Sequence, residues 1–387
     1  MTQTPPSAGA LAGCRVIDLS RVLGGPYSTQ VLADHGADVI KIEPPGGDET
    51  RGWGPPFAAG VAGDTAAYFV GVNRNKRGLA LDLAQEVGRT FLRGLLADAD
   101  VLVENFKPGT MEKWGLGYDT LKTAFPRLIH CRVSGFGADG PLGGLPGYDA
   151  CAQAMCGLMS VNGDADGEPT RVGLPVVDMV TGLNATVAIL LALNERVRSG
   201  LGQFLDITLY DCAISLLHPH APNYFYGGKV PGRSGNAHPN IAPYETFATA
   251  AGTLFLAVGN NRQFEALCRT LDAPALAQDA RFADNAARLA HRPQLHAALT
   301  ALLAGKEAAG FAETLLARGV PAAAVQDVAQ VLAHPHTRHR GMVLEDGAYR
   351  GIGSPIKLSR TPAALRRLPP ALGEHNAGIG APAANDD

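Results

Sequence analysis

The chain has 387 residues, of which 46% are hydrophobic and 18% are charged. This length and balance suit one large or two smaller folded domains and exclude a disordered chain. The formal net charge of -3 gives no electrostatic footprint for a nucleic-acid partner. The longest apolar run, residues 187–193, is too short to span a bilayer, and no signal peptide is visible. We therefore expect a cytoplasmic protein with no membrane partner.

The amino-terminal part alternates between strand and helix patterns. Residues 14–20 are a short β-rich run, residues 27–36 predict a helix that Gly36 ends, and residues 37–47 predict a second strand. The alternation continues with strands at 77–83, 100–106 and 127–137 and a helix at 86–99. Such βαβ units pair their strands in parallel. The fold class is therefore α/β, with a Rossmann-like large domain built on a mostly parallel sheet.

The remaining chain divides by composition. Residues 178–199 predict a long helix that is apolar almost all round and hence buried, and 203–217 run from strand into helix. We place the large domain at 10–217, a linker and mobile loop at 218–240, a small α+β domain at 241–335, and a return segment to the large domain at 336–380. Within the return segment, 351–359 predict a short strand.

Two patterns suggest cofactors but fail in context. Gly135-x-Gly137-x-x-Gly140 matches a dinucleotide fingerprint, yet Pro141 follows where a helix should present its amides to a pyrophosphate. A cluster of histidines at 334–339 contains a proline and no neighbouring cysteine or carboxylate to complete a metal site. The six cysteines form no C-x-x-C pair and are interpreted as buried free thiols. We expect no bound metal and no permanently bound cofactor.

Asp178 is the most informative single residue, because it begins a predicted apolar helix. One interpretation is an N-cap, in which the carboxylate accepts hydrogen bonds from the first amides of the helix. The other is a nucleophile, since an oriented carboxylate in apolar surroundings can attack an activated acyl group. The two roles are compatible.

Two further segments carry candidate binding residues. Arg74, Lys76 and Arg77 form a basic turn that is either solvated or a phosphate site. Asn105 and Phe106 follow a predicted strand, at the edge where open α/β sheets bind ligands. Phe106 could stack on a purine there, although a core phenylalanine is the commoner outcome.

Taken together, the segments resemble the class III CoA-transferase family, which includes formyl-CoA transferase, carnitine CoA-transferase and the related α-methylacyl-CoA racemases. The resemblance covers nearly the whole chain. It is carried by these motifs in order: "VIDLSRVLGGPYSTQVLADHGADVIKIEPPGGDETRGW", "NRNKRGLALDL", "ADVLVENFKPGTMEKWGLGY", "GYDACAQAMCGLMSVNG", "GLPVVDMVTGL", "GLGQFLDITLYDCA", "GVPAAAV", "HPHTRHRGM", "GSPIKLSRTP" and "LGEHN".

The resemblance implies a site and an assembly. Asp178 would be the catalytic aspartate, the large domain would bind CoA, and the protein would be an interlocked homodimer. Coenzyme A or acyl-CoA would be a substrate rather than a resident cofactor. The CoA-binding positions it implies are Leu23, Gly24, Leu81, Asp82, Leu83, Ala84, Asn105, Phe106, Lys107, Lys113, Pro146, Gly147, Tyr148 and Asp149.

The residue before Asp149 distinguishes the two branches of the family. Racemases of this family have a histidine there that works with the aspartate in proton transfer, whereas this chain has Tyr148. A phenol, which ionises near about pH 10 in model peptides, is a poor base at neutral pH. We therefore predict a CoA transferase acting on an acyl-CoA donor and a small carboxylic acid through adducts of Asp178. The alternative is a racemase-like isomerase.

We expect succinyl-CoA with a dicarboxylate acceptor as the pair of substrates. We also expect the loop at 232–240 to shield the intermediates from water.

Overall fold

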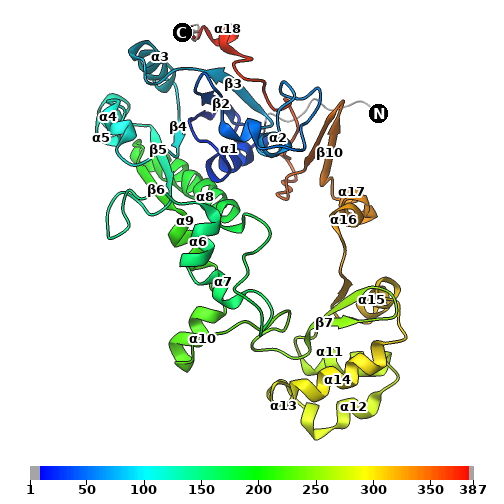
Figure 1. Cartoon of the computed structure of the whole chain (residues 1–387). Coiled ribbons are helices and arrows are strands. Elements are labelled where there is room, and N and C mark those ends of the chain that lie inside the picture. The colour runs from blue at the N-terminus through cyan, green and yellow to red at the C-terminus, as the bar shows by residue number, and fades with distance from the viewer. Residues whose placement is uncertain (1–8, 383–387) are drawn as a thin grey trace. The chain divides into compact units, whose positions relative to one another are not determined.

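The structure, a computed structural model, describes residues 9–382 (Figure 1). Contacts between residues divide this part of the chain into two compact units. The first unit contains residues 9–158, 172–219 and 335–382, and the second contains 159–171 and 220–334. The large domain predicted at 10–217 thus differs from the first unit at residues 159–171, which the contacts group with the second unit.

The first unit is built on a six-stranded sheet in the order β3-β2-β1-β4-β5-β6, and every neighbouring pair of strands in it is parallel. The strands are β1 (Arg15–Asp18), β2 (Asp38–Glu43), β3 (Lys76–Ala80), β4 (Val101–Glu104), β5 (Ile129–Ser134) and β6 (Phe204–Thr208). The α/β class with a parallel sheet is therefore confirmed. The strand order reverses direction between β1 and β4, and such a switch point opens a crevice at the carboxyl ends of the strands.

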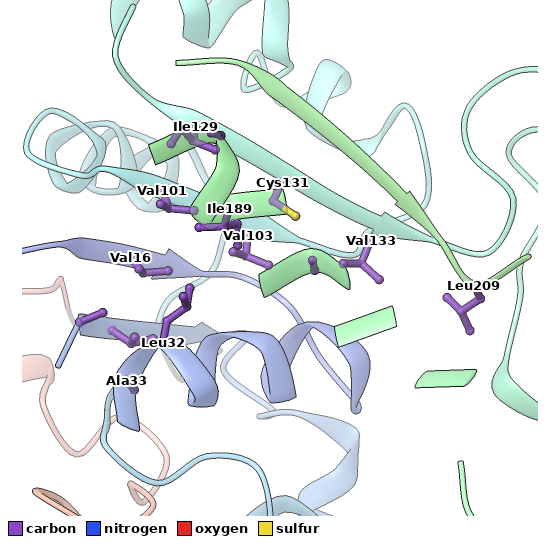
Figure 2. Close-up of a cluster of buried hydrophobic side chains, with 14 of the residues drawn as sticks. Val16, Leu32, Ala33, Val101, Val103, Ile129, Cys131, Val133, Ile189 and Leu209 are labelled. Atoms are coloured by element: carbon purple, nitrogen blue, oxygen red, sulfur yellow. The ribbon is translucent and has the colours of Figure 1, made fainter. Parts of the chain in front are cut away.

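Both faces of the sheet are covered. Successive side chains of a strand point to opposite sides, so neighbouring residues of β1 lie in two different cores. Val16 of β1 lies in the core beneath α1 (Gly24–Asp34) and α8 (Val176–Ser199), where Figure 2 shows it beside Leu32 and Ile189. The next residue, Ile17, lies in the other core, which includes Leu92 of α3 (Glu86–Leu96). Strands buried on both faces explain why the predicted strands are nearly continuous apolar runs.

The remaining helices of the first unit are short and connect or flank the strands. They are η1 (Glu49–Gly52), α2 (Ala67–Val70), α4 (Thr110–Lys113), α5 (Tyr118–Ala124), α6 (Asp149–Met155), α9 (Leu209–Ser215), α17 (Pro335–His339) and α18 (Asn376–Ile379). A further one, α7 (Leu158–Val161), begins at the last residue before the first boundary between the units. The 13 residues from Gly135 to Gly147 contain no helix or strand, as their glycine content predicts.

The carboxy-terminal return segment packs along the edge strand β3. The backbone N–H of His375 donates to the carbonyl of Gly78 at 3.0 Å, and the Asn376 side chain bonds to both the N–H and the carbonyl of Ala80. This pairing covers an edge that would otherwise expose unpaired backbone groups. The segment also forms a separate antiparallel hairpin, β10 (Val343–Asp346) and β11 (Tyr349–Ile352). Only the first two residues of the strand expected at 351–359 are in β-structure.

The second unit has its own core around a three-stranded antiparallel sheet, ordered β7-β8-β9. Its strands are β7 (Tyr244–Ala248), β8 (Thr253–Ala257) and β9 (Ala322–Ala324). Its helices are α10 (His220–Gly227), α11 (Asn261–Thr270), α12 (Pro274–Gln278), η2 (Ala280–Phe282), α13 (Asn285–Ala290), α14 (Arg292–Leu303), α15 (Ala308–Ala317) and α16 (Val328–Ala333). The presence of α10 corrects our expectation that 218–240 is entirely loop.

The long helix α8 differs from the prediction of a helix buried all round. Its inner face packs on α1 and the sheet, but four apolar side chains on its other face are 42–64% exposed. These are Leu183, Val187, Leu190 and Leu191, which lie on one side of the helix because they are three or four residues apart. Among residues 9–382, α8 is the one helix that is long and apolar enough to cross a membrane; length and composition alone do not separate such a helix from a core helix.

Candidate active site

A pocket of about 210 Å³ lies at the carboxyl ends of β1, β4 and β5, next to the switch point of the sheet. Loops after these three strands form most of its walls, and α1, η1, α8 and α9 contribute one residue each. The residues around it are Arg21, Val22, Leu23, Gly24, Glu49, Asn105, Phe106, Lys107, Pro108, Val133, Ser134, Gly135, Leu145, Pro146, Gly147, Tyr148, Asp178 and Leu209. The pocket therefore has the position expected for a ligand site in an open α/β sheet.

The structure brings nine of the fifteen predicted site residues together around this pocket. These are Leu23, Gly24, Asn105, Phe106, Lys107, Pro146, Gly147, Tyr148 and Asp178. The other six do not line it. Leu81, Asp82, Leu83 and Ala84 follow β3, with both leucine side chains buried in the core; Lys113 ends α4 on the surface; Asp149 is only 8% exposed.

Asp178 is not the N-cap that one interpretation of the sequence proposed. Helix α8 begins at Val176, its N-cap is Pro175, and Asp178 is its third residue. Within residues 9–382, no group donates a hydrogen bond to either oxygen of the Asp178 carboxylate. A Cβ atom built on Gly24 would lie 3.4 Å from Oδ1 of Asp178, so the carboxylate rests directly against the first residue of α1. The side chain is thus held at the pocket without being used as a cap.

The surroundings of Asp178 disfavour its charged form. Burial and the nearby negative charge of Asp149 raise the pKa of Asp178 to about 7. A strongly shifted carboxyl group in a pocket is typical of functional sites. Burial and the charge of Asp178 likewise raise the pKa of Tyr68 to about 12, so a neutral phenol is one of its neighbours. Tyr68 is not among the residues predicted from the sequence, because nothing in its local pattern distinguishes it from a core tyrosine.

Asn105 fastens two walls of the pocket to each other. Its side-chain oxygen accepts a hydrogen bond from the N–H of Arg21 at 2.9 Å, and its side-chain nitrogen donates to the carbonyl of Arg21 at 2.8 Å. The loops after β1 and β4 are therefore joined by a two-point bridge. Phe106 lies edge-to-face against Trp114, with 5.2 Å between ring centroids, and is half-buried, so one side of it belongs to the core.

Two backbone features shape the pocket, one where Gly135 meets Gly147 and the other at Val22. A Cβ atom on Gly135 would lie 2.8 Å from the backbone of Gly147, so only glycine allows these two strands of loop to approach so closely. Val22 adopts a φ of 69°, a left-handed conformation that is rare for a β-branched residue. Its N–H points toward the carboxylate of Asp48, at 3.3 Å from Oδ2. Backbone strain of this kind concentrates at functional sites, and no sequence signal predicts it at a valine.

The basic turn at 74–77 is not a phosphate site. Arg74 forms a buried ion pair with Asp34 of α1, and the ammonium of Lys76 lies 3.0 Å from the carboxylate of Asp18 in β1, with both side chains fully buried. Arg77 pairs with Asp38 at the amino end of β2, the edge of the sheet opposite the pocket. Carboxylates that the sequence could not place in space already neutralise these cations. In the described part of the chain, no group of three or more potential metal ligands occurs.

A Rossmann-ordered parallel sheet with a partly buried aspartate in a pocket at its switch point has the arrangement typical of an α/β protein with a ligand or active site. The chain belongs to CoA-transferase family III, whose sequence model matches residues 11–376. It is therefore a CoA-transferase, as the resemblance predicted.

Individual relatives match over nearly their full lengths. A succinate–glutarate CoA-transferase of Agrobacterium fabrum is 42% identical, covering 98% of this chain and 97% of that protein. An acetyl-CoA:oxalate CoA-transferase of Acetobacter aceti is 40% identical, covering 93% of this chain and 92% of that protein. The crystal structure of a CAIB/BAIF family protein from Brucella suis superposes with a TM-score of 0.87 at 42% identity, covering 98% of this chain and 99% of that one.

Proposed function

We propose that this enzyme moves coenzyme A from an acyl-CoA donor to a small carboxylic acid, and that Asp178 is its nucleophile. The observation that carries the proposal is the state of Asp178. Its carboxylate lies at the pocket, does not cap helix α8, and has its pKa raised to about 7. A carboxylate of raised pKa is more basic and hence more nucleophilic than an ordinary aspartate, while a substantial fraction stays ionised at neutral pH.

The reaction divides into four balanced steps. The Asp178 carboxylate adds to the thioester carbonyl of the donor and expels the CoA thiolate, leaving an acyl–aspartyl anhydride. The thiolate then attacks the aspartyl carbonyl and releases the donor acid, leaving an aspartyl–CoA thioester. The acceptor carboxylate attacks this thioester and again expels the thiolate. Finally, the thiolate attacks the acceptor acyl group, releasing acyl-CoA and the free carboxylate of Asp178.

The start of α1 supplies electrostatic stabilisation in this proposal. Each addition step produces an oxyanion at a carbonyl joined to, or facing, Asp178. Gly24 is the first residue of α1 and lies against the Asp178 carboxylate, and no side chain caps this helix. The amino end of an eleven-residue helix carries partial positive charge and free N–H groups, both of which favour an oxyanion.

We propose that the loops after β1, β4 and β5 hold the CoA portion of the substrate. Lys107 and Arg21 supply positive charge around the pocket, which suits the phosphate groups of CoA. The backbone after β3, at Leu81 to Ala84, together with Lys113 and Asp149, remains part of the predicted CoA site. For Asp149 a direct contact is the least favoured of these, because its carboxylate is occupied by protein hydrogen bonds.

For the acids, we propose a dicarboxylate pair. The first relative described above is named for succinate with glutarate, which are both dicarboxylic acids; the second is named for oxalate, also a dicarboxylic acid, with acetyl-CoA as the thioester. They match this chain at 42% and 40% identity, so overall similarity does not choose between a five-carbon and a two-carbon acid. Succinyl-CoA as donor follows from the first of them.

We also propose a cytoplasmic homodimer, interlocked as the resemblance implies. The exposed apolar face of α8, at Leu183, Val187, Leu190 and Leu191, supports an assembly, because a soluble chain rarely leaves such a stripe uncovered. A second copy of the chain is the partner that we propose for it.

The function is tested by CoA exchange. A panel of acyl-CoA donors is incubated with carboxylic acids, and the products are identified by mass spectrometry. We expect transfer between dicarboxylates, and a loss of at least a hundredfold for Asp178→Asn with CoA binding retained. CoA exchange that survives this substitution would contradict the proposal that Asp178 is the nucleophile. If a 2-methylacyl-CoA steadily takes up deuterium at its α-carbon in deuterated water, and no CoA is transferred between acids, the protein would instead be a racemase.

A further inference from the structure

The first turn of α8 is capped by a residue from a different helix. The N-cap position is Pro175, which has no side-chain acceptor. Oδ1 of Asp149, the first residue of α6, instead accepts hydrogen bonds from the N–H of Val177 at 2.8 Å and of Asp178 at 3.1 Å. These N–H groups have no partners within their own helix, so a distant carboxylate satisfies them.

The second oxygen of Asp149 is fixed as well. Gln153, one turn later on α6 and fully buried, donates from Nε2 to Oδ2 of Asp149 at 2.7 Å. The side-chain oxygen of Gln153 accepts from the N–H of Val172 at 2.8 Å. The Asp149–Gln153 pair thus holds both ends of the segment 172–178, which leads into the nucleophile.

The arrangement divides two duties between two aspartates. An aspartate in the first turn of a helix ordinarily interacts with the free amides there. At α8 those amides are taken by Asp149, and the Asp178 carboxylate accepts no hydrogen bond from the described residues. The reactive oxygens therefore keep their lone pairs for the substrate.

We propose that Asp149 is a positioning residue: it caps α8 in place of Asp178, and thereby holds the Asp178 carboxylate free and correctly placed for the thioester. This inference rests on the proposed function of Asp178. Asp149 also acts through its charge, because a neighbouring negative charge disfavours ionisation of Asp178 and so makes Asp178 more basic. The other charged or titratable groups around Asp178 are Arg21, Glu49, Lys107 and Tyr148 at the pocket and Tyr68 of α2; Asp149 is the one whose charge raises the pKa of Asp178.

Three variants separate position from charge. Asp149→Ala removes the cap and the charge. Asp149→Asn combined with Gln153→Glu reverses the donor and acceptor between the two side chains, so the acceptors for Val177 and Val172 remain while the negative charge moves one turn away. Gln153→Ala leaves the Asp149 cap and its charge in place but removes the hydrogen bonds that Gln153 makes with Asp149 and with Val172. Circular dichroism and CoA affinity confirm that each variant is folded and binds substrate.

We expect Asp149→Ala to lower kcat by roughly ten- to a hundredfold with little change in the KM for acyl-CoA, as for other residues that orient a reacting group. The double variant should recover most of kcat, and the acidic limb of its pH profile should move down by about one pH unit, because Asp178 then ionises more easily. Gln153→Ala should lie between wild type and Asp149→Ala.

The outcomes also separate this inference from the proposed function. If the wild-type enzyme exchanges CoA and Asp178→Asn abolishes exchange, while Asp149→Ala keeps both the wild-type kcat and the wild-type acidic limb, the positioning role is overturned and the nucleophile stands. If Asp149→Ala raises the KM for acyl-CoA and leaves kcat unchanged, Asp149 is a binding residue and the inference is wrong. If exchange does not depend on Asp178, both fail together.

Discussion

At the scale of single residues, the site depends on keeping one carboxylate in an unfavourable environment. Burial and a neighbouring charge raise the pKa of Asp178 from 3.8 to about 7, so ionising it in the folded protein costs free energy that the unfolded chain does not spend. Functional groups held in unfavourable environments commonly lower the stability of the folded protein while supporting its activity. The same environment that raises the pKa of Asp178 should therefore make the protein less stable.

This exchange can be measured with Asp178→Asn. The folded protein binds a proton at Asp178 more tightly than the unfolded chain does, so this group's contribution to stability falls as the pH rises from about 4 to about 7. We expect the variant to be more stable than wild type by roughly 1–3 kcal/mol at pH 8, after allowing for partial solvent exposure of the site, and nearly equal to it at pH 4. Urea unfolding at both pH values checks this. A variant that is less stable at pH 8 would show that the carboxylate is stabilised in the fold.

Sequence patterns singled out Asp178 as the proposed nucleophile but did not reveal its electrostatic partners. Asp178 is recognisable because it lies at the start of a long apolar stretch within a family motif, in the first turn of α8. Its neighbours Tyr68 and Asp149 come from α2 and α6, and only the fold brings them beside it. The same limit explains the error at Arg74 and Lys76, because their carboxylate partners lie 40 and 58 residues away in the chain.

At the scale of elements, the contact between α1 and α8 places Asp178, the proposed nucleophile. A Cβ atom on Gly182 of α8 would lie 2.6 Å from the carbonyl oxygen of Gly24 and 3.0 Å from the ring of Tyr27. Because the first of these contacts is with backbone, the two helices could not keep their spacing. Gly182 is therefore a requirement of close packing, in the same pair of helices that brings Gly24 against Asp178.

We expect Gly182→Ala to lower the free energy of unfolding by roughly 1–3 kcal/mol and to reduce kcat, since overpacking would move the start of α1 away from Asp178. Gly94→Ala is the matched control: Gly94 lies in α3, and a Cβ atom there meets nothing within 4 Å. This control should be neutral or slightly stabilising, because alanine favours helix over glycine. Equal behaviour of the two variants would contradict the role of the α1–α8 contact.

The elements themselves were largely predictable, and the exceptions have physical reasons. Buried parallel strands are short apolar runs between turn residues, so β1, β2, β4 and β5 were found within a few residues. The prediction that α8 is buried all round was wrong. An apolar face predicts that a helix face is covered, but it does not tell whether residues of the same chain cover it. Helix α10 was missed because its segment is rich in glycine, proline and histidine.

At the scale of the whole molecule, the exposed face of α8 connects the single chain to its proposed assembly. Substitution of Leu191, which is 64% exposed, by lysine should leave the fold of the chain intact but weaken association. Val87→Lys is the control, since Val87 is similarly exposed, at 60%, on α3 and lies outside the α8 face. We expect light scattering to give a dimer mass for wild type and for the control, and a concentration-dependent shift to monomer for Leu191→Lys. A monomeric wild type would refute the homodimer.

The most direct test of the account is to trap the intermediate on Asp178. The enzyme is incubated with its acyl-CoA donor in the absence of acceptor and then treated with hydroxylamine, which converts an aspartyl anhydride or thioester to a hydroxamate. Peptide mass spectrometry should find this small mass increase on the peptide containing Asp178, and Asp178→Asn should abolish it. A modified Asp149 or Asp206 would move the nucleophile, and no modified peptide with any productive donor would contradict covalent catalysis by this enzyme.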